Sequence, residues 1–327
     1  MIIAVDAAGG DYYPKNPVAG ALAALEERED LQVIFVGPRD VIEKELNERQ
    51  YAQERVDVVD APEVIGMHES PAQAVKTKSN SSIVQGLKLN AASKANAFVS
   101  AGNTGALMAA SAFILGRLEG VIRPSIATIY PNIRGTGLMI DVGANLEVKP
   151  DMLYQFGTMG EIYARQVMSI EKPRVGLLNV GEEEEKGTEI LRSANQLLQQ
   201  LPNFIGNVEG RDILYGNADV FVCDGYVGNI LLKFGETIPS TFEHILLKEI
   251  ERQQLSSDQI KLVSNLLKKA FEPFDYQRVG GVPFLGVNGV SLVGHGGSTV
   301  MAIKNMILNS ARMVDEEVNS KIVDSVN

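Results

Sequence analysis

The sequence predicts an α/β protein built on a doubly wound, mostly parallel β-sheet. Short runs of apolar and β-branched residues recur along the chain, and most of them end in a glycine-rich loop followed by a helical pattern. Near-continuous apolar runs are typical of parallel strands that helices cover on both faces. The 327 residues, of which 45% are hydrophobic, are enough for one large unit of this kind over residues 1–327.

Seven strand-and-loop units follow one another along the chain. The predicted strands, each with the loop after it, are 2–5 before AAGGD, 32–36 before GPRD, 98–100 before AGNTG, 137–140 before DVGAN, 175–178 before NVGEEEEKGT, 220–223 before DGYVGN, and 290–293 before GHGGST. Ligands of open α/β sheets bind beyond the carboxyl ends of the strands, so we expect these loops to converge on one sheet edge. Backbone N–H groups in such loops favour an anion, although any one loop alone is better explained as a tight turn.

One segment departs from the alternation of strands and helices. From residue 230 to about residue 271 the pattern is helical throughout, with a polar interruption at QQLSSDQ. A helix, a turn and a second helix are therefore predicted, and we expect them to project from the sheet as a hairpin over residues 240–278.

The composition excludes several classes of protein. A net charge of −11 argues against a general nucleic-acid-binding protein, which normally carries a basic excess. The single cysteine, Cys223, excludes a disulfide framework and fits a reducing, cytoplasmic setting. The first residues lack the basic start of a signal peptide, and the longest run of apolar and small residues, 105–116, is shorter than the ~20 residues that span a bilayer.

Motifs for nucleotide cofactors are missing. The first strand is followed by AAGGDYYP rather than G-x-G-x-x-G, and in GEEEEKGT Lys186 precedes the second glycine, unlike the lysine of a Walker A loop. Three scattered histidines do not indicate a metal site, so we expect neither a metal nor another cofactor. His295, in a loop, is as readily an acid–base residue as a structural one, whereas Cys223 is better explained as a small buried residue than as an acyl-accepting thiol.

Five longer motifs occur in a fixed order: AVDAAGGD, SAGNTGALM, DVGAN, NVGEEEEKG and VCDGYVGN. With these motifs the chain closely resembles the bacterial PlsX family of phosphate acyltransferases. The resemblance runs from residue 2 to about residue 310, with Ala8 at a position where the family usually has methionine, and residues 240–280 match least well. Several long motifs in order are far more specific than any single glycine loop.

The resemblance implies a homodimer whose fold is similar to those of the isocitrate and isopropylmalate dehydrogenases and the phosphotransacetylases. It also implies an enzyme that transfers a fatty acyl group from acyl-acyl-carrier-protein to inorganic phosphate, giving an acyl phosphate for phospholipid synthesis. Acyl transfer involving coenzyme A, or a non-enzymatic acyl-carrier docking protein, are the alternatives. Formation of acyl phosphate from purified acyl carrier and phosphate would distinguish the three.

Phosphate is itself the nucleophile of that reaction, so the site has to hold an oxyanion beside the thioester carbonyl and stabilise the tetrahedral intermediate. Lys186 is predicted to supply a positive charge, Asn103 a phosphate contact, and His295 a proton for the leaving thiolate. Further predicted phosphate and substrate contacts are Gly9, Gly10, Asp11, Gly102, Thr104, Gly105, Asn229 and Lys233. The resemblance adds Lys76, Ser81 and Ser82; the predicted site also includes Asp141, Asn145 and Asp224, with loop capping as their alternative role.

The second helix of the hairpin is predicted to be amphipathic, because apolar residues recur at spacings of three and four and lysines flank them. A long-chain acyl phosphate is poorly soluble and has to reach membrane-bound acceptors. We therefore expect shallow, reversible insertion of this helix into the inner face of the cell membrane. The predicted membrane contacts are Leu262, Val263, Leu266 and Leu267, and packing of the stripe on a partner subunit is the alternative.

Overall fold

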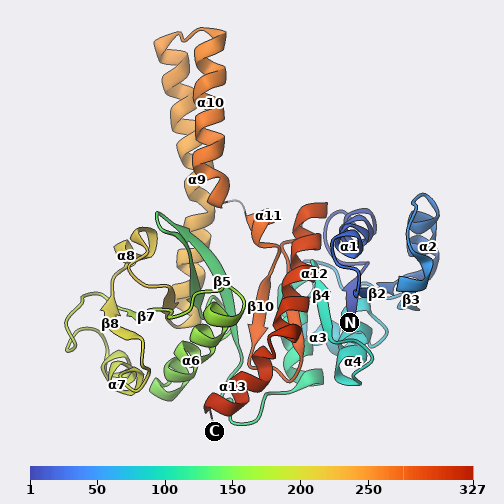
Figure 1. Ribbon diagram of the computed structural model, residues 1–327, viewed down its shortest axis with the longest axis horizontal. Helices are drawn as coiled ribbons and strands as arrows, with labels where there is room; N and C mark the ends of the chain where they lie inside the picture. Colours follow the sequence, from blue (N-terminus) through green and yellow to red (C-terminus); the bar gives the residue numbers. More distant parts are fainter. Residues whose placement is uncertain (275, 327) are drawn as a thin grey trace.

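A computed structural model gives the fold of residues 1–274 and 276–326. Eleven strands form one sheet in the order β3-β2-β1-β4-β11-β10-β5-β6-β9-β7-β8 (Figure 1). The strands are β1 (Ile2–Asp6), β2 (Gln32–Gly37), β3 (Val56–Asp60), β4 (Ala97–Ser100), β5 (Ser125–Asn132), β6 (Gly135–Ile140), β7 (Val175–Leu178), β8 (Phe204–Val208), β9 (Val220–Val222), β10 (Val282–Leu285) and β11 (Val290–Val293). The predicted α/β class with a mostly parallel sheet is confirmed.

The sheet consists of two parallel halves that run in opposite directions. Strands β1 to β4 and β11 are parallel to one another, and so are β6, β7, β8 and β9. Between the halves, β10 is antiparallel to both β11 and β5, and β5 is antiparallel to β6. The loops after β6, β7 and β9 therefore lie at the sheet edge opposite to the loops after β1, β4 and β11. The expectation that all the glycine-rich loops meet at one edge is wrong, because it did not include the antiparallel strands β5 and β10.

Helices cover both faces of the sheet. One apolar core lies under α1, α2, α6, α7, α12 and α13, and the other lies under α3, α4, α5, α8 and the start of α9. Side chains of β1 alternate between the two cores, because Ile3 and Val5 point to the first and Ala4 to the second. The helices are α1 (Lys15–Glu27), α2 (Arg39–Asn47), α3 (Pro71–Thr77), α4 (Ser82–Ala91), α5 (Thr104–Ala110), α6 (Pro150–Gln166), α7 (Glu189–Leu198), α8 (Gly210–Tyr215), α9 (Gly225–Gln253), α10 (Ser257–Phe271), α11 (Tyr276–Val279), α12 (Val300–Asp315) and α13 (Val318–Val326); a π-helical turn, Ser111–Leu115, continues α5.

Helix α9 continues well beyond the sheet and forms a projecting hairpin with α10 (Figure 1). The predicted hairpin is confirmed, although α9 already begins at Gly225 beside the sheet. Its polar turn is explained by Ser256, whose side chain caps α10 in a capping box with Gln259. The rings of Phe242 and Phe271, 6.0 Å apart, connect the two helices. No helix among the described residues combines the length and the apolar character needed to cross a bilayer.

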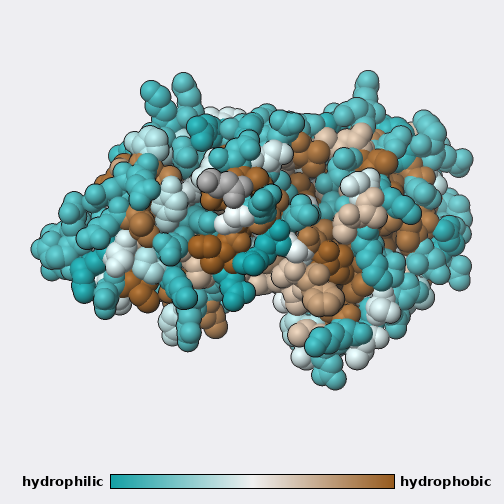
Figure 2. Space-filling view, turned by 90° about the horizontal axis from the view of Figure 1, so that it is seen from below, coloured by the Kyte–Doolittle hydropathy of each residue, from teal (hydrophilic) through white to brown (hydrophobic). Residues whose placement is uncertain are grey.

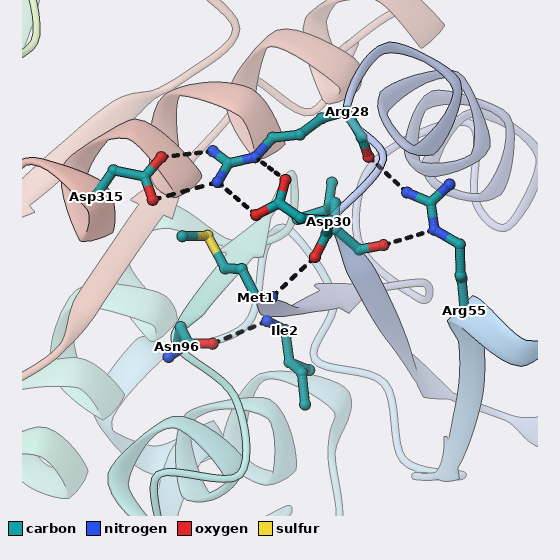
Figure 3. Close-up of polar contacts among 8 residues, drawn as sticks. Met1, Ile2, Arg28, Asp30, Arg55, Asn96 and Asp315 are labelled. Carbon is teal, nitrogen blue, oxygen red and sulfur yellow. Dashed lines mark hydrogen bonds and ion pairs between the residues drawn. The ribbon is translucent and has the colours of Figure 1, made fainter.

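The amino-terminus is tied to α12 by a cluster of polar contacts at the other end of β1 (Figure 3). Arg28 forms ion pairs of 2.7 Å with both Asp30 and Asp315. The amino group of Met1 donates to the backbone oxygen of Asp30 at 2.9 Å. Pairing with Arg28 lowers the pKa of Asp30 to about 2. These contacts hold the base of β1 against the last turn of α12 and so support the strand that ends in the first glycine-rich loop.

Candidate active site

Three glycine-rich loops meet at the carboxyl ends of β1, β4 and β11, and we call residues 7–11, 101–105 and 294–298 the glycine cluster. The N–H of Asp11 donates to the backbone oxygen of Gly296 at 2.8 Å, which joins the first loop to the third. A Cβ atom on Gly9 would lie 2.8 Å from the backbone nitrogen of Gly102, and Gly10 has a φ of +89°. Close approach of two backbones at Gly9 and a left-handed conformation at Gly10 therefore require glycine.

The buried carboxylate of Asp6 supports this cluster. It accepts hydrogen bonds from the Ser100 hydroxyl at 2.6 Å and from the N–H of Ala8 at 3.0 Å, and the Ser82 side chain adds another. Burial raises the pKa of Asp6. Next to Ser82, the hydroxyl of Ser81 is buried and has no hydrogen-bond partner among the residues that the structure describes. Sequence reasoning missed Asp6, although it is the last residue of the strand that leads into the glycines.

Asn103 joins the second loop of the glycine cluster to the loop that precedes α3. Its Oδ1 caps α5 by accepting from the N–H of Ala106 at 3.0 Å, and its Nδ2 donates to the backbone oxygens of residues 66, 67 and 69 at 3.0–3.3 Å. The side-chain amide is thus occupied by backbone groups, so the structure indicates a positioning role rather than the predicted contact with phosphate. The N–H groups of Thr104 and Gly105 lie in the first helical turn, where a helix supplies no acceptor of its own.

The loop over α5 is fixed by a cation that sequence reasoning missed. Lys78 Nζ donates to Glu69 Oε1 at 2.6 Å and to the backbone oxygen of Val64 at 2.7 Å. The predicted cation, Lys76, is exposed on α3 and does not line the cleft described next. Lys78 therefore shapes this loop, and its charge is already paired with Glu69.

A cleft of about 520 Å³ opens beside the glycine cluster, between β5 and α9, and we call it the β5 cleft. Its floor includes Ile126, Thr128 and Val142, which are all buried. One wall is a single face of α9 with residues at spacings of three and four: Asn229, Leu232, Lys233 and Glu236. At the end next to the glycine cluster, the lining residues include Thr104, Gly294 and His295. The cleft thus brings together four of the predicted site residues: Thr104, Asn229, Lys233 and His295.

His295 is oriented by the backbone of its own loop. Its Nδ1 accepts a hydrogen bond from the N–H of Gly297 at 3.1 Å. When Nδ1 of a neutral imidazole accepts, the proton is on Nε2, so this arrangement presets Nε2 as a donor. The side chain is exposed and lines the β5 cleft. On α9, Lys233 lies 3.1 Å from Glu236, so this wall carries a paired charge rather than an isolated cation.

The loop after β6 is closed on itself, and only its Val142 reaches the floor of the β5 cleft. The carboxylate of Asp141 accepts from the N–H groups of residues 126, 143, 144 and 145 and from the side chain of Asn145, at 2.7–3.3 Å. Burial raises the pKa of Asp141. Asp224 caps α9 by accepting from the N–H of Val227 at 2.8 Å. Asp141, Asn145 and Asp224 therefore take the loop-capping role that was their alternative, and they lie at the edge away from the glycine cluster.

Cys223 and Lys186 also belong to this second edge. Cys223 is buried, its Sγ donates to the backbone oxygen of Asp141 at 3.3 Å, and burial raises its pKa, so it has the properties of a small buried residue. Lys186 follows β7, half-exposed, with Nζ 4.0 Å from Glu183. Six strand spacings of about 4.8 Å separate β7 from β4, which puts Lys186 roughly 29 Å across the sheet from the second glycine loop. Within one chain, Lys186 does not join His295 and Thr104 as predicted, because the two sheet halves are antiparallel.

Metal-ligating side chains do not gather in the part of the chain that the structure describes: it holds no group of three or more histidine, cysteine, aspartate or glutamate residues placed to bind an ion. The donors at the glycine cluster are backbone N–H groups, hydroxyls, the Asn103 amide and one imidazole, and the cluster also contains the exposed carboxylate of Asp11. Such donors suit an oxyanion.

Solved structures show the same fold. A phosphotransacetylase from Streptococcus pyogenes superposes with a TM-score of 0.65 over 97% of this chain and 94% of its own, at 15% identity. The EutD phosphotransacetylase from Staphylococcus aureus gives a TM-score of 0.63 over 96% of this chain and 94% of its own, also at 15% identity. At this level of identity the likeness concerns the fold alone.

Sequence comparison is more specific. A family model described as fatty acid synthesis protein matches residues 1–321. A protein from Salinibacter ruber named phosphate acyltransferase is 50% identical over 319 residues, covering 96% of this chain and 94% of the relative. A second phosphate acyltransferase, from Chlorobaculum parvum, is 49% identical over 334 residues and covers 98% of both chains. The chain therefore belongs to the fatty acid synthesis protein family, the PlsX family of phosphate acyltransferases.

Proposed function

We propose that this protein transfers a fatty acyl group to inorganic phosphate, with acyl-acyl-carrier-protein as donor and an acyl phosphate for phospholipid synthesis as product. The observation that carries the proposal is the junction of an apolar cleft with a cluster of backbone donors. Acyl transfer to phosphate needs an oxyanion site directly beside an apolar one, and Thr104, Gly294 and His295 lie where the two meet. The names of the relatives support the same reaction.

The chemistry assigns few tasks to side chains. A phosphate oxygen attacks the thioester carbonyl carbon, the C–S bond breaks, and the carrier's thiolate leaves. The N–H groups of Thr104 and Gly105 are suited to hold phosphate, because no helical acceptor uses them. His295 Nε2–H is suited to donate a hydrogen bond to the leaving sulfur, and the thiolate takes up a proton from solvent after it leaves. Phosphate is partly dianionic at neutral pH, so no base is required.

The direct test uses purified protein, hexadecanoyl-acyl-carrier-protein and inorganic phosphate, with no added metal or nucleotide. We expect stoichiometric formation of hexadecanoyl phosphate and free carrier. Coenzyme A in place of the carrier tests the phosphotransacetylase-like alternative. If the carrier binds but no acyl phosphate forms with either donor, the proposed reaction is wrong, and a docking role is supported instead.

We further propose a homodimer that packs through α9. Tyr226, Ile230 and Phe234 recur every four residues on one face of this helix and are 60%, 52% and 67% exposed. An apolar stripe of this kind on a projecting helix is typical of a protein interface. Ile230→Glu should shift the molar mass measured by light scattering from dimer to monomer. Ile133→Glu, at an isoleucine that is 77% exposed outside α9, is the matched control.

The membrane contact predicted for the hairpin is also a proposal. Leu262 and Leu266, 61% and 59% exposed, lie one turn apart on α10, whereas Val263 and Leu267 are half-buried. We propose that the first two residues enter the headgroup layer in shallow, reversible binding to the inner face of the membrane. Leu266→Glu should abolish co-sedimentation with anionic phospholipid vesicles, while Leu146→Glu, at a leucine that is 63% exposed far from the hairpin in sequence, should not. Equal binding by both variants contradicts the proposal.

A further inference from the structure

We infer that the β5 cleft holds the hydrocarbon chain of the acyl donor, and that Leu232 on α9 determines which chain lengths the enzyme accepts. This inference rests on the proposed function and adds to it a site for the part of the substrate that does not react. Three observations carry it: the buried floor of the cleft, the position of its polar residues, and its continuity with the glycine cluster.

The floor of the cleft is apolar where it is most buried. Ile126 and Val142 are 5% and 4% exposed and lie side by side, and Thr128, two residues further along β5, is 5% exposed. These residues belong to β5 and to the loop after β6, where the central antiparallel strands pass between α5 and α9. Exchange of water for methylene groups on this floor is favourable, because it removes apolar surface on both partners from solvent.

Polar groups of the cleft lie on its rim. Lys233 and Glu236 are exposed on the α9 wall and pair with each other at 3.1 Å, and Thr104 and His295 are exposed at the glycine cluster. Leu232 belongs to the same face of α9 but is half-buried, between this rim and the floor. A linear chain that starts at a thioester near His295 therefore meets a polar entrance first, and then Leu232 and the apolar floor.

The two sheet halves form two lobes, which are also separate on the face opposite to the hairpin (Figure 1 and Figure 2). Seen from below, the surface has a notch between the two lobes, and hydrophobic side chains lie beside it (Figure 2). The occupant is the acyl chain rather than a side chain of a partner protein, because one end of the cleft is lined by the same residues that end the phosphate loops. Only a ligand with an apolar tail and a reactive polar head uses both regions at once.

The test compares chain lengths in two variants of neighbouring leucines. Leu232→Phe narrows the cleft, and Leu231→Phe is the matched control, because Leu231 is also half-buried on α9 and packs against the same core but does not line the cleft. For each protein, kcat/KM is measured with octanoyl- and hexadecanoyl-acyl-carrier-protein at saturating phosphate. Each methylene excluded from the floor should cost about fourfold. We expect Leu232→Phe to lower the hexadecanoyl-to-octanoyl ratio by roughly tenfold or more, and Leu231→Phe to leave the ratio unchanged.

A second variant and a binding measurement test independently whether Leu232 contacts the acyl chain. Leu232→Ala, which removes bulk and is easier to fold, should raise the ratio of octadecanoyl to hexadecanoyl turnover. Hexadecyl phosphate, an unreactive analogue of the product, should bind more weakly to Leu232→Phe than to the parent protein in calorimetry. An unchanged length profile in both Leu232 variants, or an equal loss at every chain length, would overturn the inference. If the parent protein makes no acyl phosphate, the proposed function fails, and the cleft is then judged by hexadecyl phosphate alone: equal binding by both proteins refutes it.

Discussion

The same motif, a buried aspartate followed by glycine, occurs at both edges of the sheet but has a different role at each edge. At each edge a strand ends in a buried aspartate followed by glycine: Asp6 before the first glycine-rich loop and Asp141 before the loop after β6. The carboxylate of Asp141 accepts hydrogen bonds from the N–H groups of residues 143, 144 and 145 of its own loop. At the other edge, the first-turn N–H groups of Thr104 and Gly105 lie beside a cleft. An aspartate-and-glycine motif therefore marks an ordered loop, and whether the loop binds an anion depends on which N–H groups it leaves available.

Replacement of Gly9 should have the largest effect on activity. In Gly9→Ala, the new methyl group would lie 2.8 Å from the nitrogen of Gly102 and would push the first two loops apart. We expect kcat/KM to fall by about 10³-fold or more, because both positioning and donor geometry are lost. Gly210→Ala is the control, since a Cβ there meets nothing within 4 Å. A folded Gly9→Ala protein with near-normal turnover would show that phosphate does not bind at the glycine cluster.

Removal of one polar side chain from each edge tests at which edge phosphate binds. His295→Phe removes the proposed hydrogen-bond donor to the leaving sulfur and should lower kcat about 10²-fold. Lys186→Ala removes a half-exposed charge at the other edge, and we expect kcat/KM to stay within about threefold of the parent value. If Lys186→Ala is as damaging as His295→Phe, then phosphate meets Lys186, either at the second edge or across a contact between two chains. Recovery of activity on mixing the two variants would identify the contact between chains.

At the second edge the expected effect is on stability. Asp141→Asn replaces one acceptor by a donor that faces backbone N–H groups, and we expect a loss of ~2–4 kcal/mol in the free energy of unfolding. Asp224→Asn should change it by less than about 0.5 kcal/mol, because asparagine caps a helix about as well as aspartate does. Urea titration followed by circular dichroism measures both. Equal stability of the parent and Asp141→Asn proteins would contradict the closed-loop description.

The smallest effect concerns acid stability and the ion pairs that hold the base of each sheet half. Arg28 lowers the pKa of Asp30 to about 2, and hydrogen bonds from Arg174 lower the pKa of Asp219 although burial opposes this. A carboxyl whose pKa is lower in the folded state stabilises the protein above its unfolded pKa of about 3.9 and loses that contribution as pH falls through the folded value. The Tm difference between the parent protein and Arg28→Ala should thus be constant from pH 7 to 5 and shrink from pH 4 to 2. A difference that grows on acidification would contradict the assignment.

The fold class, the helices on both faces and the projecting hairpin could be predicted, because each depends on periodicity within one segment. The direction of the second sheet half could not. It is set by β5 and β10, and proline within each, at Pro131 and Pro283, argues against a strand when only the sequence is read. Because the sequence does not indicate this reversal, it predicts Lys186 and Asp141 at the same site as His295. The roles of Asp6 and Leu232 could not be predicted for another reason. They depend on the residues that pack against these side chains, and the spacing of residues within one segment does not indicate such contacts.

We propose that phosphate and the acyl chain meet where the glycine cluster joins the β5 cleft. A crystal structure of the protein with hexadecyl phosphate tests it most directly. We expect the phosphoryl group within hydrogen-bond distance of the N–H groups of Thr104 and Gly105 and beside His295, with the alkyl chain passing Leu232 toward Ile126 and Val142. A phosphoryl group bound beside Lys186 in the loop after β7, or an alkyl chain lying outside the cleft, would contradict it.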